Sequence, residues 1–142
     1  MAIANLHETI QNSILRRNQL QLEINELQSQ KTLATYSQAD VQSLLSSEKH
    51  SIRDYFKDLY ENDPALQEKY LDYKKIPDFE EQIDRITAEF QEQLEELAAW
   101  ETAIDAQITT NSAELEEIKA YLESYKQMLS TNVQEDFDFG LN

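Results

Sequence analysis

The residues of this chain that catalysis or metal binding would most readily use are two histidines, His7 and His50. Cysteine is absent from all 142 residues, which excludes a thiolate nucleophile, a thiolate metal site and a disulfide framework. One histidine stands near the amino end of a predicted long helix and the other on its far part, so the two cannot share a site within one hairpin. Each histidine is therefore interpreted as a solvated surface residue.

Carboxylates are abundant, and some lie four residues apart on a predicted helix, as Glu92 and Glu96 do. Catalytic carboxylates need a concave site that shifts their pKa values, and the exposed face of a coiled coil offers no such concavity. Metal binding by such pairs would be unspecific. A chain with one glycine, Gly140, also has no glycine-rich phosphate loop. The sequence therefore favours a protein that is not an enzyme and that binds no cofactor or metal.

The chain is strongly acidic, with a formal net charge of −16. Residues 1–60 hold six basic and seven acidic side chains, whereas residues 61–142 hold six and twenty-one. A field of this sign repels nucleic acid phosphates and anionic lipid surfaces. Nucleic acid is therefore not expected as a partner. Membrane insertion is not expected either, because no segment approaches the ~18 apolar residues that cross a bilayer.

The first part of the chain predicts one long helix over about residues 3–61. With one glycine and two prolines there are few positions at which a helix can end, and most of the common residue types favour helix. Apolar residues recur every seven positions, which is typical of a left-handed coiled coil. The positions assigned to the seam are Ile3, Leu6, Ile10, Ser13, Arg17, Leu20, Ile24, Leu27, Lys31, Ala34, Gln38, Val41, Leu45, Glu48, Ile52, Tyr55 and Leu59.

One segment of this helix could instead be a break. Residues 37–40 resemble a capping box, with Asp40 in place of the usual Glu or Gln, and the seam is polar nearby at Lys31 and Gln38. A break there would give a bundle of three or four helices. Since neither glycine nor proline accompanies the motif, we expect a continuous helix that is weak near residues 31–40.

An elbow is predicted at residues 62–77. Asp63 can cap a helix that begins with Pro64 and runs to about Lys75. Ile76 precedes Pro77 and is therefore pushed out of the helical region of backbone space.

A second long helix is predicted over about residues 78–130. Its apolar residues recur at spacings of three and four, with one four-residue phase jump between Phe90 and Leu94, which is a stutter. Two helices of nearly equal length around a short elbow predict an all-α fold, a long antiparallel coiled-coil helical hairpin within residues 1–130. Helix content should exceed about four fifths, with no strand. Residues 131–142 lose the period and are expected to form an acidic-aromatic tail.

Polar residues in the seam are the first candidate functional set. They cost stability while fixing register and partner number, unless the seam is simply poorly optimised. If Leu59 and Phe79 close the tip, residues in contact across the hairpin should have numbers that sum to about 138, give or take a heptad. That register places Gln38 near Glu101 and Trp100, Leu27 near Asn111, and Arg17 near Leu122 and Glu117. The polar seam residues are Arg17, Lys31, Gln38, Glu101 and Asn111.

Aromatic residues form two further candidate sets. The cluster at the elbow either closes the hairpin tip as a small core or docks a partner, and the alternating acids and aromatics of the tail suit docking into a groove on another protein. A frayed terminus is the alternative for the tail. The elbow set is Tyr55, Phe56, Tyr60, Tyr70, Tyr73 and Phe79, and the tail set is Phe137, Phe139 and Leu141.

Several apolar residues lie off the predicted seam and widen the apolar surface beyond what a two-helix coil buries. We therefore expect a structural or assembly protein that forms a homo-oligomer, in the manner of a filament or appendage subunit. The alternative is a cytoplasmic chaperone or adaptor that binds another protein through its helices or elbow. The expected location is the cytoplasm, or outside it by a route without a cleaved signal peptide. The residues off the seam are Leu15, Leu22, Leu44, Phe56, Leu94 and Tyr121.

Overall fold

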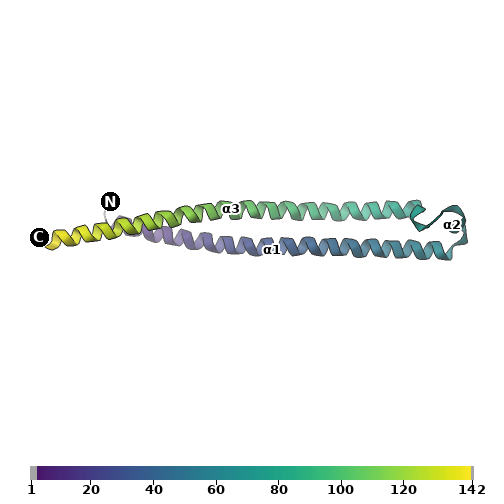
Figure 1. Ribbon diagram of the computed structural model, residues 1–142, viewed down its shortest axis with the longest axis horizontal. Coiled ribbons are helices and arrows are strands. Elements are labelled where there is room, and N and C mark those ends of the chain that lie inside the picture. Colours follow the sequence, from purple (N-terminus) through teal and green to yellow (C-terminus); the bar gives the residue numbers. More distant parts are fainter. Residues whose placement is uncertain (1–2, 142) are drawn as a thin grey trace. The chain divides into compact units, whose positions relative to one another are not determined.

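The structure, a computed structural model, is an all-α helical hairpin (Figure 1). It describes the backbone of residues 3–141 and the side chains of residues 4–134. Helix α1 runs over Ile3–Asn62 and has 60 residues, and helix α3 runs over Pro77–Leu141 and has 65. These two helices already account for more than four fifths of the chain, and the described residues include no strand. The predicted fold class and helix content are confirmed.

Helix α1 is continuous through residues 31–40, so the predicted weak segment does not break it. Glycine and proline are both absent from Ile3–Asn62, and the capping-box residues take part in the helix instead of starting a new one. The bundle of three or four helices is therefore excluded. The polar seam residues of this segment find partners on α3, as described below.

The elbow differs in detail from its prediction. Asp63 caps helix α2, which covers Pro64–Lys69, and its carboxylate accepts a hydrogen bond of 3.0 Å from the amide of Ala65. The helix ends at Lys69, not at Lys75, because Asp72 caps a separate 3₁₀ turn, η1, over Tyr73–Lys75. Ile76 is extended before Pro77, as predicted.

Helix α3 continues to Leu141, beyond residue 130, where we expected it to end. Loss of the apolar period removes a packing stripe but leaves backbone hydrogen bonding intact, so the helix runs past its predicted end. No proline follows Pro77, so nothing in the sequence forces the helix to stop. The side chains of Phe137, Phe139 and Leu141 lie outside the described residues, and their docking role stays a prediction.

The chain divides into two compact units, residues 1–31 with 103–142, and residues 32–102. Both long helices contribute to each unit. The first unit has a well-buried seam in which leucine and isoleucine of α1 meet those of α3. Ile24 and Ile118 belong to one apolar cluster, as the register predicted. The buried residues of its two clusters are Leu6, Ile10 and Leu122, and Leu20, Ile24 and Leu115.

The second unit buries less of its apolar surface. Its buried apolar residues are Ala34, Phe56 and Ile76. The remaining seam residues are half-buried, as two facing helices without further cover leave them. These half-buried residues are Val41, Leu45, Ile52, Ile83, Ile86, Phe90, Leu94 and Leu97.

The seam of α1 changes phase inside this second unit, against the prediction. Tyr55 and Leu59 were assigned to the seam but are exposed, whereas Phe56, assigned off the seam, is only 3% exposed. Half-buried Phe90 and Leu94 agree with the stutter predicted on α3. Two helices that pack side by side need the same spacing between successive seam residues. The extra four-residue spacing on α3 is therefore accompanied by an extra four-residue spacing on α1.

None of the helices, over the residues that the structure describes, is both long and apolar enough to cross a membrane.

Candidate functional site

Three of the polar seam residues, Lys31, Gln38 and Glu101, make contacts across the hairpin in the predicted register. The ammonium of Lys31 lies 2.7 Å from the carboxylate of Asp105, and the side-chain amide of Gln38 donates a hydrogen bond to Glu101. These two pairs have residue numbers that sum to 136 and 139, against the predicted 138. The polar layers therefore seat against each other instead of against leucine, which penalises a shifted register.

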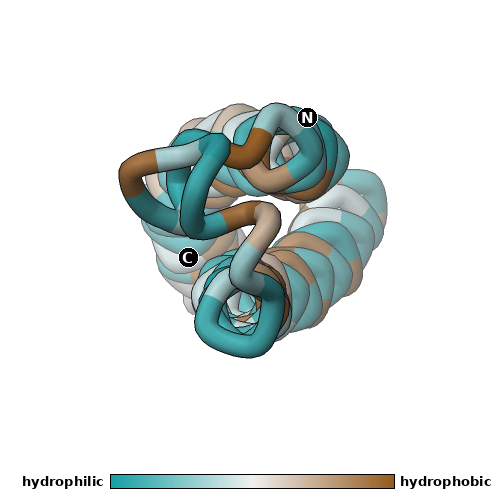
Figure 2. Tube along the Cα trace, turned by 90° about the vertical axis from the view of Figure 1, so that its right-hand side faces the viewer, coloured by the Kyte–Doolittle hydropathy of each residue, from teal (hydrophilic) through white to brown (hydrophobic). Residues whose placement is uncertain are grey.

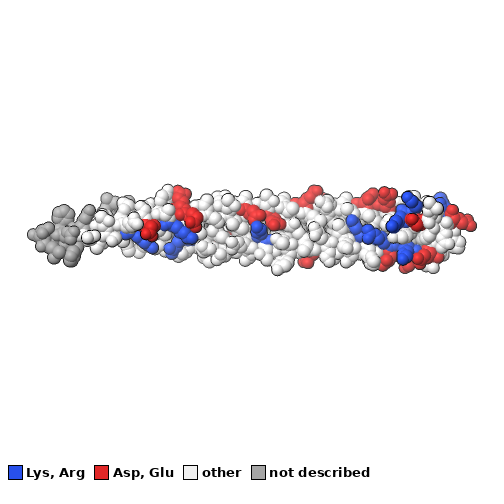
Figure 3. All heavy atoms as spheres, viewed as in Figure 1, with Lys and Arg blue, Asp and Glu red and all other residues white. Residues whose placement is uncertain are grey.

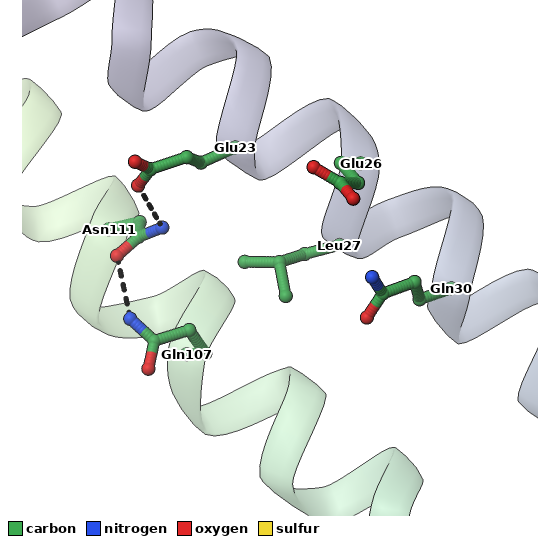
Figure 4. Close-up of a pocket in the computed structure, with 6 residues that line it drawn as sticks. All are labelled: Glu23, Glu26, Leu27, Gln30, Gln107 and Asn111. Atoms are coloured by element: carbon green, nitrogen blue, oxygen red, sulfur yellow. Dashed lines mark hydrogen bonds between the residues drawn. The ribbon is translucent and has the colours of Figure 1, made fainter.

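Asn111 is the one buried polar side chain among the described residues. Its amide donates a hydrogen bond of 3.3 Å to Glu23, and its carbonyl oxygen accepts one of 2.8 Å from Gln107 (Figure 4). Glu23 comes from α1, and Gln107 stands one turn before Asn111 on α3. Only the bond to Glu23 crosses between the helices, so this alignment is favoured because a shifted one would leave the buried amide nitrogen without that partner.

Arg16, not Arg17, makes the cross-helix contact of this region. Its guanidinium donates two hydrogen bonds to the carboxylate of Glu114, of 3.0 and 3.1 Å, in a bidentate arrangement. These bonds raise the pKa of Arg16. The expected approach of Arg17 to Glu117 is replaced by a hydrogen bond from Tyr121 to Glu117, which raises the pKa of Tyr121. The heptad placed Arg17 in the seam, and that prediction was wrong by one residue, since Arg16 makes the contact with α3.

Replacing Asn111 by leucine tests whether the amide sets the register. Asn111→Leu should raise the free energy of unfolding by about 1–2 kcal/mol, because an apolar side chain then fills a buried seam position. The same change should broaden the register, which double electron–electron resonance between spin labels on α1 and α3 would report as a wider distance distribution. Lower stability with an unchanged distribution would show that Asn111 is a packing residue only.

The surface hollow lined by Asn111 is shallow and polar. It has a volume of about 280 Å³ and is lined by Glu23, Glu26, Leu27, Gln30, Gln107 and Asn111 (Figure 4). Leu27 and Asn111 line the same hollow, in agreement with the predicted register. The hollow contains no histidine. Across the residues that the structure describes, no group of three or more potential metal ligands comes together.

The elbow aromatics form a small core with exposed edges. Phe56 packs edge-to-face on Phe79 at 5.5 Å between ring centroids, and Tyr73 meets Phe79 at 5.4 Å. The hydroxyl of Tyr60 donates to the carbonyls of Tyr70 and Leu71, which ties the elbow to α1. These contacts agree with a closing core, and a docking role stays a prediction. Figure 2 looks onto this end and shows apolar segments among hydrophilic ones on the turn.

Exposed apolar side chains are concentrated on α1. Of the residues assigned off the seam, Leu15, Leu22, Leu44 and Tyr121 are exposed, whereas Phe56 is buried and Leu94 is half-buried, so the last two were assigned wrongly. Two more exposed residues of α1, Leu33 and Tyr36, were not predicted from the sequence. The sequence does contain a pattern that indicates a second apolar side of this helix, because Leu33, Leu44 and Tyr55 stand eleven residues apart. The exposed large apolar residues of α1 are Leu15, Leu22, Leu33, Tyr36, Leu44, Tyr55 and Leu59.

In comparisons with known proteins, no family model, curated protein or solved structure matches this chain.

Proposed function

We propose that this chain is a non-enzymatic structural or assembly protein whose helices self-associate, in the manner of a filament or appendage subunit. The observation that carries the proposal is the exposed apolar surface of α1 within residues 32–102. Other residues of this stretch of α1 pack on α3, yet five large apolar side chains remain exposed: Leu33, Tyr36, Leu44, Tyr55 and Leu59. Several large apolar side chains exposed along one stretch of a helix favour association.

The distribution of charge supports association through α1 over association through α3. Within residues 32–62, α1 carries three basic and five acidic side chains, whereas residues 77–102 of α3 carry one basic and nine acidic. Packing α3 against α3 would bring these acidic surfaces together, and the repulsion opposes contact. The elbow end of the face drawn in Figure 3 carries side chains of both signs.

Size-exclusion chromatography with light scattering, followed by negative-stain microscopy, tests the proposal. We expect a mass above that of one 16.6 kDa chain, rising with concentration. A single monomeric species at every concentration and salt would refute self-assembly. A known protein that binds in a fixed ratio to a monomeric chain would favour the chaperone or adaptor instead.

Association should strengthen as salt rises. With a net charge of −16 on each chain, neighbouring copies repel, and ~0.15 M salt or more shortens the range of that repulsion to about 8 Å. Sedimentation velocity across a salt series would measure the change. A steady loss of assembly with added salt would show that attractive ion pairs between copies dominate, against this prediction.

A further inference from the structure

We propose that one flank of α1 is the contact through which two copies of this chain pair, antiparallel and centred on Leu44. This inference rests on the proposed self-assembly and names its surface. The α1 flank consists of residues that the structure shows exposed and that recur every three or four positions along the helix: Leu33, Tyr36, Asp40, Leu44, Ser47, Ser51 and Tyr55.

The flank is separate from the seam that packs α1 on α3. Leu33, Leu44 and Tyr55 each precede a buried or half-buried seam residue, namely Ala34, Leu45 and Phe56. One residue along an α-helix turns roughly 100° around its axis, so the flank faces well away from the seam. The large side chains of the flank are therefore mostly exposed, and Tyr55 has an edge contact with Phe56.

The repeat of the flank suits packing against another straight helix. Leu33, Leu44 and Tyr55 stand eleven residues apart, which is about 3.67 residues per turn and close to the 3.6 of an unstrained helix. The three side chains therefore stay almost in line along α1. A neighbouring helix can contact all of them without the strong supercoil that a seven-residue repeat demands.

A second copy fits the flank because the flank is complementary to itself. With Leu44 opposite Leu44, an antiparallel copy brings Leu33 opposite Tyr55 at both ends of the contact. Asp40 then falls beside Ser47 of the second copy, whose hydroxyl can donate a hydrogen bond to the carboxylate. Parallel pairing would set Asp40 against Asp40 and align the two helix dipoles, and both effects oppose association.

Charge makes α1 a better surface than α3 for a second copy, because the more acidic α3 surfaces are then not forced face to face. Asp40 and the exposed Glu48 each stand four residues from Leu44, so two carboxylates per copy border the contact and salt screens their repulsion. The four large apolar side chains of the flank present on the order of 100 Å² each, or about 400 Å² per copy, which is half of the roughly 800 Å² per partner of a standard interface and suits a weak contact. Such an interface supports a concentration-dependent dimer.

Leu44→Glu tests the contact, because the substitution sets two carboxylates against each other at its centre. We expect the dissociation constant of the dimer to rise by more than about a hundredfold in sedimentation equilibrium. Ala39→Glu is the matched control. It adds the same charge to an exposed position of α1 five residues earlier, roughly 140° around the helix. Circular dichroism should show unchanged helix content in both variants.

The possible results distinguish failure of the α1 flank as the contact from failure of self-assembly itself. Wild-type protein that stays monomeric refutes self-assembly and the interface together. Wild-type protein that associates equally well as Leu44→Glu refutes the α1 flank alone. Equal weakening by Ala39→Glu also refutes the flank, because added charge at any position would then suffice.

Single cysteines give the orientation, since the chain has none of its own. Leu44→Cys should form an interchain disulfide on mild oxidation. Leu33→Cys alone should stay reduced, and a mixture of Leu33→Cys with Tyr55→Cys should cross-link between the two variants. Efficient cross-linking of Leu33→Cys to itself would overturn the antiparallel arrangement.

Discussion

Phe56→Ala should lower the free energy of unfolding by about 3 kcal/mol or more. Phe56 is 3% exposed and packs edge-to-face on Phe79, which in turn contacts Tyr73. Truncation removes the apolar area of a ring and leaves a cavity that the elbow can fill only in part. Urea denaturation followed by circular dichroism measures the change.

Tyr55→Ala is the matched control, because Tyr55 is the adjacent aromatic residue and is 61% exposed. In dilute solution it should cost less than about 1 kcal/mol, the loss of one edge contact with Phe56. The heptad pattern of the sequence makes the opposite prediction, since it assigns Tyr55 to the seam and Phe56 outside it. A larger loss from Tyr55→Ala than from Phe56→Ala would restore the sequence-based phase and contradict the structure.

Leu20→Ala should lower the free energy of unfolding by about 3 kcal/mol. The side chain of Leu20 is fully buried, in a cluster with Ile24 and Leu115 and with Ile118 packed against it. These neighbours belong to two long helices whose backbones cannot shift locally to close the cavity. Thermal or urea unfolding measures the loss.

Leu22→Ala has the same change of side chain two positions later, where the residue is 69% exposed. It should alter stability by less than about 0.5 kcal/mol, because no cavity forms. Comparable losses from the two variants in dilute protein would mean that Leu22 is covered in the folded chain. The assignment of that side of α1 to solvent would then be wrong.

The elbow shows which helix boundaries can be predicted from capping residues and prolines and which cannot. Asp63, Pro64 and Pro77 determine where helices end and begin through local sterics and capping, and the structure places those boundaries as predicted. The end of α2 was predicted wrongly. Asp72 had two local uses, as a residue within a longer helix or as the cap of a new turn, and the packing of the neighbouring Tyr73 against Phe79 favours the second.

The polar seam also combines a feature that the sequence predicts with one that it does not. The register of Lys31 and Gln38 against α3, and of Asn111 against α1, followed from the sequence, because the elbow length and the apolar repeat leave few alignments of two antiparallel helices. Which arginine crosses to α3 did not follow. Arg16 and Arg17 differ by roughly 100° around α1, and only the packed geometry shows that the guanidinium of Arg16 faces Glu114.

Helix ends and apolar repeats are local properties, so they predict two long helices, the elbow that joins them and approximately which residues meet. Which side of α1 stays exposed beyond residue 45 depends on how α1 packs on α3. A seven-residue repeat and an eleven-residue repeat differ by one position there, and a single position moves a side chain roughly 100° around the helix. Packing against the stutter of α3 selects Phe56 for the core, and that selection leaves Tyr55, in line with Leu33 and Leu44, on the surface.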